Sequence, residues 1–183
     1  MKIKTACLIF VWSLLLYSCK EVSFREPQPV GVPALKEVPK ALQGRYVGID
    51  EDGKETDTVI VESWGYHIKD TDDNDWLGRG VISDSLVIKY FEDYCFVNFR
   101  SGDQWVLRVI KQKPSGDIQF LSINVSDDKK RKDILKKLNK KKLTVKEIER
   151  KDDTYYQINP TKEQLVQLLK EGFFTGGDLS RMK

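Results

Sequence analysis

Short apolar runs punctuated by turn-forming residues fill the chain between residues 44 and 123. In the run 86–90, Leu86, Ile88 and Tyr90 fall on one face, which is the period-2 alternation of a half-buried strand. Runs rich in β-branched and aromatic residues predict strands at 45–49, 58–61, 64–68, 86–90, 94–99, 105–110 and 118–123. The short connections favour antiparallel neighbours, because parallel strands need long crossovers.

The pattern changes after residue 123. Residues 127–139 are predicted to form a helix with a narrow apolar stripe, and either Ser126 or Asp127 is its N-cap. Two further strands are expected at 143–148 and 155–158.

A second late helix follows the last predicted strand, with Leu165 on its apolar face. It begins either with Asn159 as the cap before a proline, or with a capping box formed by Thr161 and Gln164. Gly172 is expected to end it. The predicted fold class is therefore α+β: predominantly an antiparallel β-meander, as a curved sheet or small open barrel, with one or two late helices.

The first nineteen residues form a separate unit. Lys2 and Lys4 precede an apolar stretch, 6–17, that is too short to cross a bilayer as a helix. The sequence Leu16-Tyr17-Ser18-Cys19 then resembles the lipobox of bacterial lipoproteins. That resemblance implies cleavage after Ser18 and acylation of Cys19, with palmitate-like chains, as the mature N-terminus. A plain secretory signal with an incidental cysteine is the alternative.

The residues after the cysteine bear on location. No aspartate follows Cys19 directly, so the inner-membrane retention signal of enteric lipoproteins is missing. The charged pair Lys20-Glu21 resembles surface-export signals of Bacteroidota lipoproteins. These resemblances imply a cell-envelope protein held in the outer membrane, on its periplasmic or its outer face, whose first partner is the bilayer.

The domain organisation predicted from these patterns has four parts. Residues 1–18 are a signal peptide, and 19–40 hold the lipidated Cys19 and a proline-rich tether. Residues 41–175 form a single β-rich domain, and 176–183 a flexible tail.

Composition mainly excludes classes. The 183 residues include 31 basic and 28 acidic side chains, and a net charge of +3 gives no reason to expect nucleic-acid binding. Three cysteines cannot build a disulfide framework and one histidine cannot build a multi-histidine metal site, so no cofactor is expected. Charge is nevertheless polarised: 50–75 is acidic and 127–151 is basic. The basic block is either a solvated face or a contact for anionic lipid or an envelope protein.

Candidate reactive residues are few. Cys95 and His67 could form a nucleophile pair, but each sits in an apolar strand, where a buried cysteine usually acts as a small hydrophobic residue. The loop with Asp70, Asp72 and Asn74 offers oxygen ligands for calcium, but it departs from the EF-hand pattern at its glycine and its final glutamate. We therefore expect no metal, with these three residues as the weak candidates.

The expected function is a membrane-anchored, non-enzymatic binding or scaffolding module. One alternative is a carrier of a small apolar ligand, since a meander of this kind resembles the lipocalin-like architecture in topology. Its ligand would be surrounded by strand aromatics: Trp64, Trp105, Tyr90 and Phe120. The other alternative is a hydrolase that uses His67. The oligomeric state does not follow from the sequence.

Overall fold

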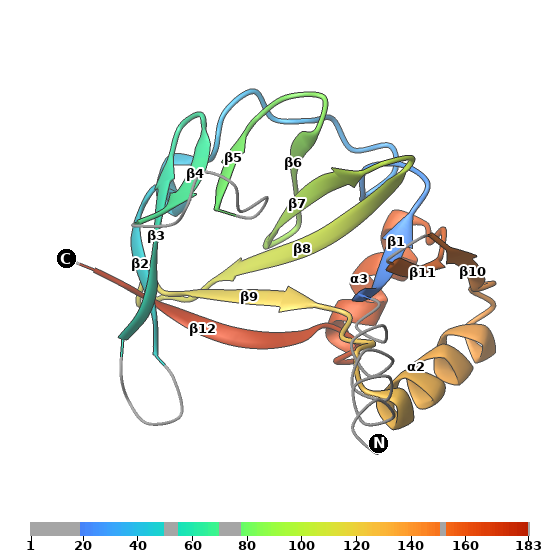
Figure 1. The fold of residues 1–183 in the computed structure, drawn as a ribbon. Helices are drawn as coiled ribbons and strands as arrows, with labels where there is room; N and C mark the ends of the chain where they lie inside the picture. The colour runs from blue at the N-terminus through green and yellow to red at the C-terminus, as the bar shows by residue number, and fades with distance from the viewer. Residues whose placement is uncertain (1–18, 50–54, 70–77, 151–152, 183) are drawn as a thin grey trace, which may run out of the picture.

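The structure is a computed structural model that describes residues 19–49, 55–69, 78–150 and 153–182. Its described part is mostly β, with a mixed sheet of twelve strands that does not close and two α-helices late in the chain, as the α+β prediction requires (Figure 1). The strands are β1 (Cys19–Phe24), β2 (Gly44–Ile49), β3 (Glu55–Glu62), β4 (Gly65–Ile68), β5 (Arg79–Val81), β6 (Leu86–Phe91), β7 (Tyr94–Ser101), β8 (Gln104–Gln112), β9 (Ile118–Ser122), β10 (Lys146–Glu149), β11 (Asp153–Gln157) and β12 (Thr175–Arg181). The helices are the 3-10 turn η2 (Lys40–Leu42), α2 (Asp128–Lys140) and α3 (Lys162–Lys170).

The sheet curls upon itself (Figure 1). Along the curl the strands follow the order β6-β7-β8-β9-β12-β2-β3-β4-β5, and every neighbouring pair is antiparallel. Strands β5 and β6 are consecutive in the chain but share no ladder, so the curl stays open between them. A side branch starts at β8, whose first residues pair with β1; β1 then pairs with β11 in the one parallel ladder of the described strands.

The tether predicted over residues 19–40 is wrong for its described residues, because this segment is part of the fold. Val22 and Phe24 of β1 are core residues, with Phe24 only 2 % exposed. Glu21 forms a two-point ion pair with Arg108 of β8, with an Nη2–Oε1 distance of 2.6 Å. Alternating Val22 and Phe24 was the strand signal here, and the prolines that follow obscured it.

The proline-rich stretch itself is bound to the outside of β6 and β7. Buried Asn98 accepts from the backbone N–H of Gln28 at 2.7 Å and donates to its carbonyl at 2.8 Å. Lys89 donates to the carbonyls of Pro27 and Pro29 at 2.7 and 2.9 Å. Burial lowers the pKa of Lys89, opposed by the charge of Glu26. Backbone polar groups that proline leaves without a regular ladder are thus satisfied by side chains.

The flexible tail predicted from residue 176 is also wrong for its described part. Strand β12 lies between β9 and β2 and completes the curl. Its glycines concealed it, yet one of them is required: a Cβ on Gly176 would lie 1.9 Å from the Phe120 carbonyl oxygen. The glycine therefore permits a close backbone approach between β12 and β9.

Helix ends follow the predicted capping chemistry. Asp127 is the N-cap of α2 and accepts from the Lys130 N–H at 2.8 Å. Thr161 and Gln164 form the reciprocal capping box of α3, so the alternative start at Asn159 is wrong. Gly172, with φ at +75°, follows α3. In the part of the chain that the structure describes, no helix has the length and apolar character needed to cross a bilayer.

Two hydrophobic cores lie on opposite faces of β7, β8 and β9. We call the first the outer core; there α3 and α2 pack on the sheet, and its buried residues include Phe96, Leu107, Val109, Leu138, Leu165 and Leu168. We call the second the inner core; it lies within the curl and includes Tyr46, Leu86, Ile88, Cys95, Val97 and Ile118. Alternation along β7 makes both, since Phe96 faces outward while Cys95 and Val97 face inward.

Candidate functional site

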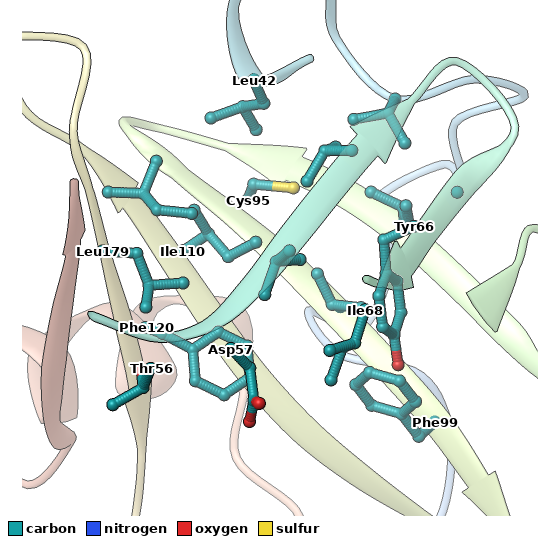
Figure 2. A pocket seen from close by; sticks show the side chains of 17 residues that line it. Leu42, Thr56, Asp57, Tyr66, Ile68, Cys95, Phe99, Ile110, Phe120 and Leu179 are labelled. Carbon is teal, nitrogen blue, oxygen red and sulfur yellow. The ribbon is translucent and has the colours of Figure 1, made fainter. Parts of the chain in front are cut away.

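The inner core contains a cavity of about 310 Å³ (Figure 2). Side chains from β3, β4, β6, β7, β8, β9 and β12 line it, together with Val38 and Leu42 from the N-terminal segment. Its volume lies at the lower end of the range for small-molecule sites in proteins. The cavity is the candidate functional site.

The lining is almost entirely apolar. Val59, Ile88, Val97 and Ile110 are representative. Among the lining residues that the structure describes, the side chains with a polar atom are Thr56, Asp57, Tyr66 and Cys95. Cys95 is buried, and burial raises the pKa of its thiol to about 12. The thiol is therefore neutral at ordinary pH and contributes a polarisable apolar surface, not a nucleophile.

The two ends of the cavity differ: Leu42 lies at one end, and Asp57 and Phe120 lie at the other (Figure 2). Leu42 of η2 is buried, and its carbonyl accepts a 3.0 Å hydrogen bond from the Tyr46 hydroxyl. Leu42, Cys95 and Ile110 also line a neighbouring pocket of about 320 Å³, so these three side chains are shared by the two spaces. At the other end, Asp57 is exposed and Phe120 is 39 % exposed. A bound molecule would thus have an apolar interior and a wet entrance.

Strand alternation explains why β3 and β4 supply so much of the wall. Val59 and Val61 are two apart on β3 and both face inward, as do Tyr66 and Ile68 on β4. Gly65, with φ at +150°, lies against β5: a Cβ there would be 1.9 Å from the Gly80 carbonyl oxygen. A glycine at this position lets β4 and β5 approach closely at the edge of the curl.

The structure does not bring His67 and Cys95 together. His67 lies between two inward-facing residues of β4 and points to the opposite face, where its ring stacks on Trp64 at 5.9 Å. Its Nδ1 is 3.7 Å from the Glu62 carboxylate, beyond hydrogen-bonding distance. The Arg79 guanidinium lies over the Trp64 ring, 5.1 Å from its centroid. The His67–Cys95 nucleophile pair that the sequence left as a possibility is therefore not formed, and Cys95 is a buried core residue, as the sequence interpretation favoured.

Of the four aromatics expected around a ligand, Phe120 alone lines the cavity. Trp64 stacks on His67, and Trp105 packs against the outer core. Tyr90 is exposed and lines the neighbouring pocket. The sequence interpretation missed the aliphatic walls from β3 and β4, which the valine alternation on β3 could have indicated.

The remaining site candidates are placed only in part. Asp70, Asp72 and Asn74 lie outside the described residues. Among the residues that are described, no group of three or more His, Cys, Asp or Glu side chains could hold a metal ion. Cys19 is the first residue of β1 and pairs with Asp153 of β11. Its acylation stays a prediction.

Three comparisons with known proteins gave no match: no family model, no curated protein and no solved structure resembles the chain significantly.

Proposed function

We propose that this protein is an envelope lipoprotein whose curled sheet binds a small apolar molecule in the inner cavity, as a carrier or receptor. The observation that carries the proposal is the cavity itself. A partly open space of about 310 Å³ is lined almost wholly by aliphatic and aromatic side chains, most of them from seven strands. Burial of an apolar molecule there is favoured by roughly 25 cal/mol for each Å² removed from water.

The arrangement of strands supports a carrier over a scaffold. Neighbouring antiparallel strands wrap around the cavity, with η2 at one end, which resembles the lipocalin-like architecture. The large hydrophobic residues exposed on the described surface are Val30, Val81, Tyr90, Phe120 and Met182, and they come from five different segments. A docking module would instead present a broad apolar patch.

The chemistry of the lining limits the ligand class. Asp57, at the more exposed end, is the only charged side chain among the described residues that line the wall. A bound anion would lie near this carboxylate without a compensating cation in the lining. The ligand is therefore a neutral apolar molecule, or one whose polar end is a hydrogen-bond donor directed to Asp57.

A neutral fluorescent naphthylamine, N-phenyl-1-naphthylamine, tests the proposal. We expect saturable binding with a blue-shifted emission, and a loss of affinity of at least tenfold in Val59→Phe, which places a phenyl ring inside the cavity. Thr58→Phe, on the opposite face of the same strand, is the matched control and should bind as the parent does. Equal binding by both variants, or none by the parent protein, would exclude the cavity as the binding site.

The anchor is proposed on the lipobox at residues 16–19, with the outer membrane as the location. In a bacterial host, labelled palmitate should be incorporated into the parent chain and into Cys95→Ala, but not into Cys19→Ala. Incorporation into Cys19→Ala would show that the lipidation site is wrong.

A further inference from the structure

A lysine stripe runs along the solvent face of α2. Lys129, Lys132, Lys136 and Lys140 are three or four residues apart, so they lie on one face, and all four are exposed. The opposite face is apolar: Leu138 is buried in the outer core, and Ile134 and Leu135 pack against it. The apolar stripe of α2 is thus used within the protein, while the lysine stripe is not.

The acidic residues of α2 are paired with other cations. Asp128 contacts Arg131 at 2.5 Å, and Asp133 contacts Lys137 at 2.6 Å. Within the described ranges the lysine stripe forms no ion pair with the protein. Like charges at i and i+4 destabilise a helix, so this stripe has a cost in the isolated domain that an anionic surface would remove.

The position of β1 indicates which anionic surface would face α2. Lys20, next to the anchor residue, forms a 3.2 Å ion pair with Asp128 in the first turn of α2. Figure 1 shows β1, α2, β10 and β11 on the same side of the molecule. A lipid attached at Cys19 would therefore hold the first turn of α2 beside the bilayer, because the sheet begins at Cys19 itself and leaves no spacer.

We propose that α2 docks on a bilayer containing anionic phospholipid, and that this contact fixes the orientation of the domain on the membrane. The inference rests on the proposed anchor at Cys19. The anchor gives the lysine stripe a high effective concentration at the headgroups, and each cation near an anionic surface adds about a factor of five. With its apolar stripe buried, α2 lies at headgroup level and does not insert.

The test uses the full chain, purified from bacterial membranes and reconstituted in vesicles of phosphatidylcholine, with or without 30 % phosphatidylglycerol. A fluorophore is attached through Asn139→Cys, beside the stripe, while buried Cys95 stays unlabelled. We expect a headgroup-borne spin label to quench this fluorophore only in anionic vesicles. A label at Asp84→Cys, in the turn before β6, should not respond to vesicle charge.

Replacement of Lys132, Lys136 and Lys140 by Gln should lower the ratio of docked to undocked protein on the order of 100-fold. The matched control replaces three exposed lysines of other elements, Lys36, Lys40 and Lys111, and should leave quenching unchanged. The proposal is overturned if quenching is the same on neutral and anionic vesicles. It is also overturned if both triple variants lose quenching equally.

A failed anchor gives a different result. If the protein does not float with neutral vesicles in a density gradient, the anchor at Cys19 is contradicted. If the protein floats but its quenching does not depend on vesicle charge, only the docking of α2 is contradicted. Quenching that appears on neutral vesicles when an acidic protein is added, but does not appear on anionic vesicles, would also overturn the proposal.

Discussion

The inner and outer cores are built from the same three strands and differ in what covers them. The outer face of β7–β9 is covered by α3, whose Leu165 and Leu168 fill the space above the sheet. The inner face is covered by the curl of its own sheet, and a cavity of about 310 Å³ remains between the walls. Hydrophobic alternation assigns a residue to a face, but the length and curvature of what lies opposite decide whether that face is filled.

The largest expected effect is in the outer core. Leu165 is fully buried, so Leu165→Ala removes most of a closely packed side chain and leaves a void. We expect a loss of about 2–5 kcal/mol in the free energy of unfolding, measured by urea denaturation. A loss below 1 kcal/mol would mean that α3 is not a tightly packed cover, and the contrast between the cores would disappear.

The next effect concerns alkaline pH and the inner core. Burial raises the pKa of Cys95 to about 12, whereas the thiol of the unfolded chain has a pKa of 9.0. Ionisation therefore favours the unfolded state: this contribution to stability is complete below pH 9 and falls as the pH rises toward 12, by up to about 1.4 kcal/mol per pH unit.

Cys95→Val should remove that part of the alkaline decline. It should leave the part due to Tyr46, whose pKa is also raised by burial. The measurement is the difference in unfolding free energy between the parent and the variant at pH 8, 9 and 10. A difference that stays constant with pH would show that Cys95 is reached by water in the cavity.

A pair of valines on adjacent strands compares the two cores directly. Val109 faces the outer core and is 0 % exposed, while Val97 lines the cavity and is 6 % exposed. Val109→Ala should cost about 2 kcal/mol and Val97→Ala about 1 kcal/mol, because a side chain beside a cavity loses fewer packed neighbours. Only Val97→Ala should alter the affinity for the naphthylamine. The reverse order in stability would contradict the assignment of the cores.

The smallest effect is at the start of the covering helix. Thr161→Ala breaks the capping box of α3 and should cost about 1 kcal/mol, measured by urea denaturation. Because the helix covers only the outer core, affinity for the naphthylamine should not change. Thr161→Ser keeps the hydroxyl and is the control; if it is as destabilising as alanine, the hydroxyl is not the source of the effect.

Local patterns predicted the elements whose signal is local. The meander strands, the cap at Asp127, the capping box of α3 and the stop at Gly172 follow from nearby residues. The sequence does not show that Cys19 would pair with Asp153, because such long-range pairing leaves no periodic trace. Strand β12 was missed for a similar reason: its Gly176 fits a close approach to β9 that only the folded sheet reveals.

The sequence made it possible to predict the kind of site, an apolar ligand cavity, but not most of the residues that line it. A curved antiparallel sheet made an apolar carrier one alternative, and Phe120 was among the expected ligand contacts. The other three aromatics were misplaced because large aromatic side chains pack equally well on either face of a strand, and the face of Trp105 depends on α3 and β1 being present.

The placement of β12 has a consequence for the order in which the protein folds. β12 joins β9 to β2, so the wall around the cavity depends on residues 175–181. Because β12 is the last strand of the sequence, β2 to β9 are all synthesised before it. The wall around the cavity is therefore complete only once this last strand has paired, and until then the edges of β2 and β9 are unpaired and open to aggregation.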